Sequence, residues 1–161
     1  MYLTATRPDI LYVVSVLSRF LNCAKESHMI AAKRVVRYLK GTSCHGVKFT
    51  KSKELKLSGF SDIDWAGSAD DMKSTSGYCF SLGSACFSWC SKMQEIVAQS
   101  TAEAEFIAAT ATANQALWLR KLMQDLHLSS KEGTEVYVDN QATLAISHNP
   151  VFHGRTKHFK L

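Results

Sequence analysis

Acidic side chains gather in one short stretch of the sequence, residues 61–71, which reads SDIDWAGSADD. Four of its eleven residues are the aspartates Asp62, Asp64, Asp70 and Asp71, and a stretch rich in lysine and arginine precedes it. Crowded carboxylates repel one another unless a cation lies between them. Hard oxygen ligands suit Mg²⁺ or Mn²⁺. Two interpretations follow: a solvated acidic loop, or part of a metal site that lies beside a polyanion.

Two more acids lie where they could join Asp62. Asp62 and Asp139 each end a predicted strand, and Glu105 lies early in the long helix predicted between these strands. Each acid also has a simpler explanation, because Asp139 can cap the next helix and Glu105 can complement a helix dipole. On adjacent elements of one sheet, however, the three would form a carboxylate cluster, which indicates a divalent-metal site.

The remaining aspartates of this stretch have other predicted roles. An EF-hand loop that starts at Asp62 is excluded, because its fifth and twelfth positions hold alanine and lysine. Asp64 is expected to be structural or to support a ligand, since residues 65–67 (WAG) predict that the strand ends. Asp70 and Asp71 are expected in a solvated turn.

The segment from Leu55 onward predicts a mixed α/β sheet. Alternation of apolar and polar residues predicts a strand from Leu55 into Asp62, followed by strands at 78–82 and 85–90 that a tight Gly83-Ser84 turn joins. Three strands with short turns indicate an antiparallel meander. A further strand is predicted at 136–138, and a short helix after it to about residue 148.

A long helix is predicted between the third and fourth strands. Ser100-Thr101-Ala102-Glu103 matches a capping box, so Glu103 is assigned to the cap and the helix to about Leu126. Its expected buried stripe consists of Phe106, Ala109, Ala113, Leu117 and Leu122. Trp89 and Trp118 are expected in the core.

The first forty residues predict two helices. One begins at Thr6–Asp9, where proline and an acid favour a first turn, and runs to Leu21. Ser27 is expected to cap the second, which Gly41 ends. Its expected buried stripe is Ala31, Ala32, Val35, Val36 and Leu39. A short strand at 46–49 is an option in the connector that follows.

Charge is distributed unevenly along the 161 residues, which carry a net charge of +5. Ten lysines and arginines face three acids through Glu54, and nine face eleven after it. The second helix carries Lys33, Arg34, Arg37 and Lys40, which could follow a phosphate backbone or form an ordinary solvated face.

Cysteine usage and hydropathy indicate a soluble protein from a reducing compartment. The five cysteines contain no CxxC pair, so they fit neither a zinc site nor a disulfide framework, and we expect small buried apolar residues. No secretory leader is recognisable, and no apolar run approaches the roughly 20 residues that span a bilayer. We therefore expect an intracellular, cytoplasmic protein that is not secreted and has no membrane partner.

Several stretches together resemble the end of the Pol polyprotein of copia-type LTR retrotransposons, over nearly the whole chain. They are YLTATRPDI, AAKRVVRYLKGT, SDIDWAGSADDMKSTSGYCFSLGSACFSWCSKMQ, VAQSTAEAEFIAA, LWLRKL, VYVDNQATLAI and NPVFHGRTKH. Residues 1–50 resemble the helical tail of the reverse transcriptase, which is thumb- or connection-like. Residues 55–161 resemble its ribonuclease H domain, truncated at the C-terminus. The resemblance implies a ribonuclease H-like mixed sheet after a small helical segment.

This resemblance implies endonucleolytic cleavage of the RNA strand of RNA–DNA hybrids by two Mg²⁺ ions, for which Mn²⁺ can substitute. Carried over residue by residue, the catalytic and metal-binding carboxylates are Asp62, Glu105 and Asp139, with Asp62 bridging both ions. The implied substrate-binding residues are Asn140, Gln141, Arg155, Lys157 and His158. The implied partners are the hybrid and the rest of the Pol polyprotein, with virus-like particles as a further location.

One departure from the family pattern leaves two hypotheses about ribonuclease H activity. Relatives have a fourth acid just after TKH, where this chain has Phe159-Lys160-Leu161. A cation there would oppose binding of the second metal ion. Two hypotheses follow: a metal-dependent ribonuclease H, impaired by loss of the fourth acid, or a catalytically dead remnant that folds and binds nucleic acid without cleaving it. A glycosyltransferase that uses Asp62 and Asp64 as a DxD motif is a weaker third.

Overall fold

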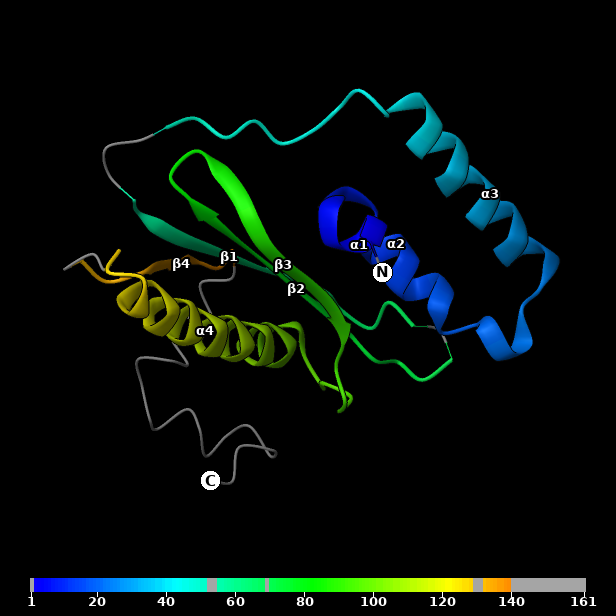
Figure 1. The fold of residues 1–161 in the computed structure, drawn as a ribbon. Helices are drawn as coiled ribbons and strands as arrows, with labels where there is room; N and C mark the ends of the chain where they lie inside the picture. The colour runs from blue at the N-terminus through cyan, green and yellow to red at the C-terminus, as the bar shows by residue number, and fades with distance from the viewer. Residues whose placement is uncertain (1, 52–54, 69, 129–131, 140–161) are drawn as a thin grey trace. The chain divides into compact units, whose positions relative to one another are not determined.

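The computed structural model describes residues 2–51, 55–68, 70–128 and 132–139 (Figure 1). The chain divides into two compact units, residues 1–48 and residues 49–161. The short helix predicted after Asp139 lies outside the described residues. Within them, no helix combines the length and the hydropathy that a membrane-crossing segment needs.

The second unit is built on a four-stranded mixed sheet. Its strands are β1 (Leu57–Asp64), β2 (Thr75–Leu82), β3 (Ala85–Met93) and β4 (Glu135–Tyr137), in the order β3-β2-β1-β4. β1 pairs antiparallel with β2, β2 antiparallel with β3, and β1 parallel with β4. With the long helix, this arrangement confirms the predicted α/β class and agrees with a ribonuclease H-like fold.

β2 and β3 are longer than the hydrophobic pattern predicted, whereas β1 is shifted along the chain and begins at Leu57 instead of Leu55. β1 does not end at Asp62 but continues to Asp64, which pairs with Thr75, and Thr75 in turn pairs with Met93. The pattern failed at these ends because cross-strand hydrogen bonding, which needs no hydrophobic side chain, extends the ladder. β4 begins one residue earlier than predicted, at Glu135.

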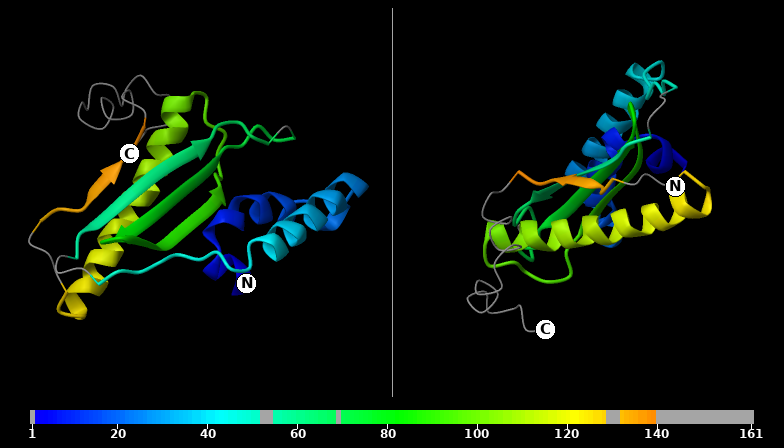
Figure 2. Two further views of the ribbon diagram at one scale, coloured as in Figure 1. Left: turned by 90° about the horizontal axis from the view of Figure 1, so that it is seen from above. Right: turned by 90° about the vertical axis from the view of Figure 1, so that its left-hand side faces the viewer.

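One face of the sheet is covered by the helix α4 (Thr101–Asp125) (Figure 2). Ser100 is its N-cap, and its hydroxyl accepts a hydrogen bond from the amide of Glu103 at 3.2 Å. The carboxylate of Glu103 in turn accepts from the amide of Gln99 at 2.8 Å. The capping function predicted for Glu103 is thus confirmed, and these bonds satisfy amides that the first turn leaves free.

The core between sheet and helix is small. It contains Leu57, Phe80, Ala116, Leu119 and Met123. The helix stripe predicted from hydrophobicity was wrong. The face of α4 that lies against the sheet carries mainly small residues, which let the helix approach closely. Besides Glu103 and Glu105 in the first turns, the buried residues of α4 are Ala104, Ala108, Thr112, Ala116, Leu119 and Met123.

Several of the larger apolar residues of α4 lie toward solvent instead. Leu117 and Leu122 of the predicted stripe are exposed, and so is Trp118, with 56% of its surface accessible. Trp118 is therefore not a core residue as expected. Large side chains here would hold the helix away from the sheet, so small ones take the contact face.

The first unit is a series of short helical elements. α1 (Tyr2–Thr6), the 3₁₀ turn η1 (Pro8–Ile10), α2 (Leu11–Ser18) and the 3₁₀ turn η2 (Leu21–Cys23) replace the single first helix that was predicted. Proline restricts the residue before it to extended conformations, and Arg7 accordingly has φ −128° and ψ 85°.

The helix α3 (Glu26–Gly41) ends where the sequence predicted, but its N-cap is Lys25 rather than Ser27. Val36, expected in its buried stripe, is exposed, and no residue of α3 is buried. No strand forms at residues 46–49.

A polar cluster joins η1 to the end of α3 inside this unit. Asp9 accepts hydrogen bonds from Arg7 at 2.7 Å and from the Tyr38 hydroxyl at 2.8 Å, and Arg7 also donates to Thr42 Oγ1 at 2.7 Å. The Arg7 hydrogen bond lowers the pKa of Asp9 to about 2. Asp9 thus links two helical elements as well as lying in a first turn.

The five cysteines are free thiols, as predicted, but none is buried. Cys23 and Cys44 are exposed, and Cys79, Cys86 and Cys90 are partly exposed on the sheet. Burial first, and then the neighbouring thiol of Cys86, raise the pKa of Cys79 to about 11.

Gly59 generates a prediction about packing. A Cβ at this position would lie 2.6 Å from a ring carbon of Phe80, which is fully buried. We expect Gly59→Ala to lower the free energy of unfolding by about 1–3 kcal/mol, as overpacking does. Urea denaturation followed by circular dichroism measures this.

Gly133→Ala is the matched control, because a Cβ there meets no atom within 4 Å. We expect it to change the free energy of unfolding by less than about 0.5 kcal/mol. Equal stabilities of the two variants would contradict the close contact between Gly59 and Phe80.

Candidate metal site

The first carboxylate of the site lies near the carboxyl end of β1. Asp62 pairs with Gly77 of the neighbouring strand, so no side chain opposite it obstructs that face of the ladder. Its side chain is exposed, and its Oδ1 accepts a hydrogen bond from the amide of Ile63 at 2.8 Å. A short local bond of this kind fixes the carboxylate and leaves its other oxygen available to a ligand.

The second carboxylate, Glu105, belongs to the first turns of α4. Only 3% of its surface is exposed, and its Oε2 atom has no hydrogen-bond partner. An ionised carboxylate buried in this way is costly unless a cation or a proton compensates it. Glu105 is therefore the residue of the site that most needs a ligand.

The third carboxylate follows β4. Asp139 is exposed and lies two residues beyond Tyr137, the last residue of that strand. Because β4 is parallel to β1, with Phe60 paired to Tyr137, the carboxyl ends of both strands lie at the same edge of the sheet. Ligand sites of open α/β sheets occupy this edge.

These three residues converge. One carboxylate oxygen from each of Asp62, Glu105 and Asp139 lies within 4.8 Å of the others. Burial, first, and the charges of Asp139 and Asp62 raise the pKa of Glu105 to about 7. Without a cation, the cluster therefore holds a proton near neutral pH, as expected of carboxylates that repel one another.

The neighbouring aspartates do not belong to this cluster. Alternation places Asp64 on the same side of β1 as Asp62, but its carboxylate packs against Gly67, where a side chain would overlap it. The structural role predicted for Asp64 agrees with this contact. Asp71 accepts a hydrogen bond from the amide of Lys73 at 3.1 Å, as in a turn, and Asp70 is exposed.

Residues predicted to bind substrate lie outside the described part of the chain. They are Asn140, Gln141, Arg155, Lys157 and His158, and Lys160 lies there too. Their predicted roles stay predictions.

Sequence reasoning missed Gln94, which directly follows β3. Its side chain is 5% exposed and reaches both β2 and α4 through hydrogen bonds. The stretch SKMQ was noticed only as part of the resemblance. A glutamine in a polar stretch predicts a surface residue, so the burial of Gln94 could not be expected from the sequence.

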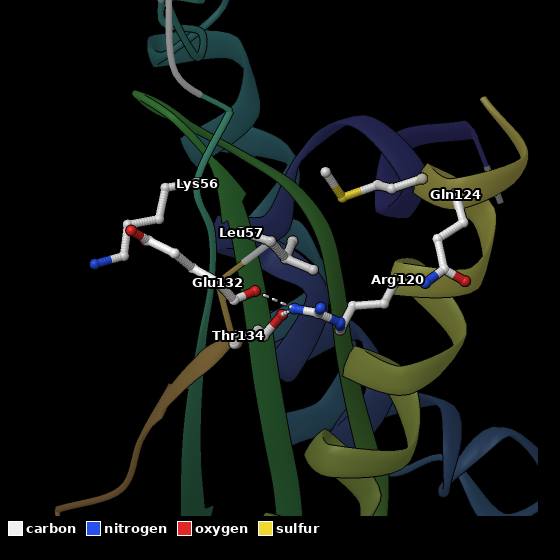
Figure 3. Close-up of a pocket in the computed structure, with 8 residues that line it drawn as sticks. Lys56, Leu57, Arg120, Gln124, Glu132 and Thr134 are labelled. Carbon is white, nitrogen blue, oxygen red and sulfur yellow. Dashed lines mark hydrogen bonds between the residues drawn. The ribbon is translucent and has the colours of Figure 1, made fainter. Parts of the chain in front are cut away.

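A separate pocket lies at the other end of β1 (Figure 3). Arg120 of α4 donates hydrogen bonds to the carbonyl oxygen of Glu132 at 2.6 Å and to Thr134 Oγ1 at 3.4 Å, beside Leu57. The pocket has room for about 20 Å³ of solvent, roughly one water molecule. These contacts fasten the segment before β4 to α4, and the pocket contains none of the three carboxylates.

Comparison with known proteins gives relatives of one kind over nearly the whole chain. It is 41% identical over 160 residues to the retrovirus-related Pol polyprotein from transposon RE1 of Arabidopsis thaliana, covering 99% of this chain and 11% of that protein. It is 44% identical over 156 residues to the Pol polyprotein from transposon TNT 1-94 of Nicotiana tabacum, covering 97% and 12%. The chain thus spans about a ninth of these relatives.

A shorter relative carries a different name. The chain is 46% identical over 120 residues to secreted RxLR effector protein 161 of Plasmopara viticola, which covers 74% of this chain and 84% of that protein. No protein-family model matches the chain, and no solved structure matches it significantly. On the two near-complete matches, the chain belongs to the family of retrovirus-related Pol polyproteins of copia-type transposons and corresponds to one segment of them.

Proposed function

We propose that the second unit is a ribonuclease H that cleaves the RNA strand of RNA–DNA hybrids with two bound Mg²⁺ ions. The observation that carries this proposal is the convergence of Asp62, Glu105 and Asp139 within 4.8 Å on a ribonuclease H-like sheet. Membership of the Pol polyprotein family supports it.

The residues present fit a divalent cation. Among the described residues, the site offers one carboxylate oxygen from each of three acids, and Mg²⁺ and Mn²⁺ prefer such oxygen ligands. One of them, Glu105 Oε2, is buried without a partner, and a cation would compensate it. Two bound Mg²⁺ ions would supply a hydroxide made from water and would stabilise the leaving oxygen of an in-line displacement at phosphorus.

The chain's own residues would then have distinct tasks. Asp62, which is exposed at the edge of the sheet, is proposed to bridge both ions. Glu105 and Asp139 would hold the ions together with Asp62 and so fix the position of the scissile phosphate relative to the cluster. Asn140 and Gln141 adjoin Asp139 in sequence, where they could contact the 2′-hydroxyl that distinguishes RNA from DNA.

The basic residues of the C-terminal tail complete the proposal. Arg155, Lys157 and His158 would hold phosphate groups of the hybrid or assist release of the product. The upstream reverse transcriptase and the rest of the Pol polyprotein would deliver the hybrid.

A second candidate function is binding of nucleic acid without cleavage. It is favoured by one observation: Lys33, Arg34, Arg37 and Lys40 are all exposed on α3. Both candidate functions involve binding of nucleic acid. They differ in whether the carboxylate cluster binds the metal ions that cleavage needs. The glycosyltransferase hypothesis loses support, because the carboxylate of Asp64 packs on Gly67 instead of joining Asp62.

Cleavage of a labelled RNA–DNA hybrid in Mg²⁺ tests the proposed activity. We expect the full chain to cut the RNA strand and Asp62→Asn to reduce the rate by roughly 100-fold or more, since the metal ions contribute several kcal/mol of charge stabilisation. Asp70→Asn, which makes the same change in an exposed turn outside the cluster, should leave the rate unchanged. A parent chain that binds the hybrid without cutting it favours the second candidate.

The raised pKa of Glu105 predicts a pH-dependent affinity for Mg²⁺. Because the metal ion must displace the proton from Glu105, whose pKa is about 7, affinity should fall about tenfold per pH unit below 7 and level off above it. Calorimetric titration of the full chain with Mg²⁺ at several pH values measures this.

The same shift predicts the stability of the metal-free protein. The folded state holds the proton more tightly than the unfolded state, in which the pKa is near 4.5, so this group stabilises the fold below pH 4.5 and loses that contribution as the pH rises to 7. Glu105→Gln should remove both pH dependences, and their persistence in that variant would assign them to another group.

The basic face of α3 gives a prediction about binding alone. If this face contacts phosphates, Arg37→Gln should weaken hybrid binding and reduce the slope of log affinity against log salt by about one. Lys121→Gln is the control, because this exposed residue on α4 carries the same charge. Equal salt slopes for both variants and the parent would exclude α3 from the interface.

A further inference from the structure

Gln94 follows β3 and bonds to β2 and α4 beside the carboxylate cluster of Asp62, Glu105 and Asp139. Its backbone amide donates to the carbonyl of Ser74 at 2.8 Å, immediately before β2. Its side-chain amide nitrogen donates to Ser76 Oγ of β2 at 2.8 Å and to the carbonyl of Ala104 in α4 at 2.9 Å. One buried side chain thus ties the first turn of α4 to the sheet.

Both anchor points adjoin residues of the cluster. Ala104 immediately precedes Glu105, and Ser76 pairs with Ile63, the neighbour of Asp62. The orientation of the amide is determined, because the carbonyl of Ala104 can only accept a hydrogen bond and so the nitrogen of Gln94 must face it. The distance between β2 and the start of α4 therefore depends on the length of this side chain.

Two features argue against a purely structural role for Gln94. Ser100 and Glu103 already cap α4, so the helix does not need Gln94 to begin. The Oε1 atom of Gln94 is buried without a partner, which is a cost that an apolar side chain of similar size would not incur. A role in positioning the start of α4 relative to the sheet therefore explains a glutamine here better than a contribution to the stability of the fold does.

We propose that Gln94 is a positioning residue that sets the separation of the Glu105 and Asp62 carboxylates and so makes the cluster competent to bind a divalent cation. This inference rests on the proposed function. It concerns the geometry of the metal site and not the cleavage step.

Gln94→Met in the full chain tests this, because methionine is similar in size and cannot donate. We expect Mn²⁺ affinity, measured by calorimetry, to fall about 10- to 100-fold, as when other residues that orient metal ligands are removed. Amides in the first two turns of α4 should also exchange hydrogen faster, which mass spectrometry measures without any metal. If Gln94→Met does not fold, Gln94→Asn replaces it, since the shorter chain cannot reach both partners.

Met123→Ala is the matched control, because Met123 packs in the core at the far end of the same helix. It should lower thermal stability but leave Mn²⁺ affinity within about twofold. The proposal is overturned if Gln94→Met, or Gln94→Asn in its place, binds Mn²⁺ as the parent does, or if Met123→Ala weakens binding equally.

These outcomes separate the inference from the proposed function. A parent that binds Mn²⁺ through the cluster but does not cut the hybrid contradicts the nuclease and leaves the positioning role standing. A parent that cuts the hybrid while Gln94→Met keeps its Mn²⁺ affinity contradicts the positioning role alone. A parent that binds no Mn²⁺ overturns both.

Discussion

The repulsion among three carboxylates that lie within 4.8 Å of one another is the constraint on which the site depends. Burial first, and then the neighbouring Asp139 and Asp62, raise the pKa of Glu105 to about 7, so a proton on this carboxyl lowers the repulsion in the metal-free cluster. A divalent cation would relieve the same repulsion without the proton. The fold must therefore hold these residues together against their charges, because an unconstrained chain would separate them.

The scaffold that does so is modest in size and relies on backbone pairing and small residues. Parallel pairing of β4 with β1 brings Asp62 and Asp139 to one edge of the sheet. The small residues of α4, such as Ala104 and Ala108, let the helix lie close enough for Glu105 to reach them. Large side chains on that face would move Glu105 away from the strands. Packing thus determines the distance that the chemistry needs.

The division of the chain into two units fits its place in a larger protein. The relatives that match nearly all of it are about nine times longer, and they are Pol polyproteins. The second unit contains the sheet and the carboxylates, whereas the first contains short helices with a single buried hydrophobic residue, Ile10, among those described.

In the second unit, the sequence by itself determined the types and order of the described strands and the long helix, and it named the three acids, because strand alternation and the capping box at Ser100 are local signals. It misplaced the buried face of α4 and the end of β1, since small residues and ladder pairing carry no hydrophobic signature. Only the tertiary structure decided that Glu105 is buried with its Oε2 atom unpaired and that Gln94 joins β2 to α4. Both facts arise from contacts between residues distant in sequence, which no local pattern encodes.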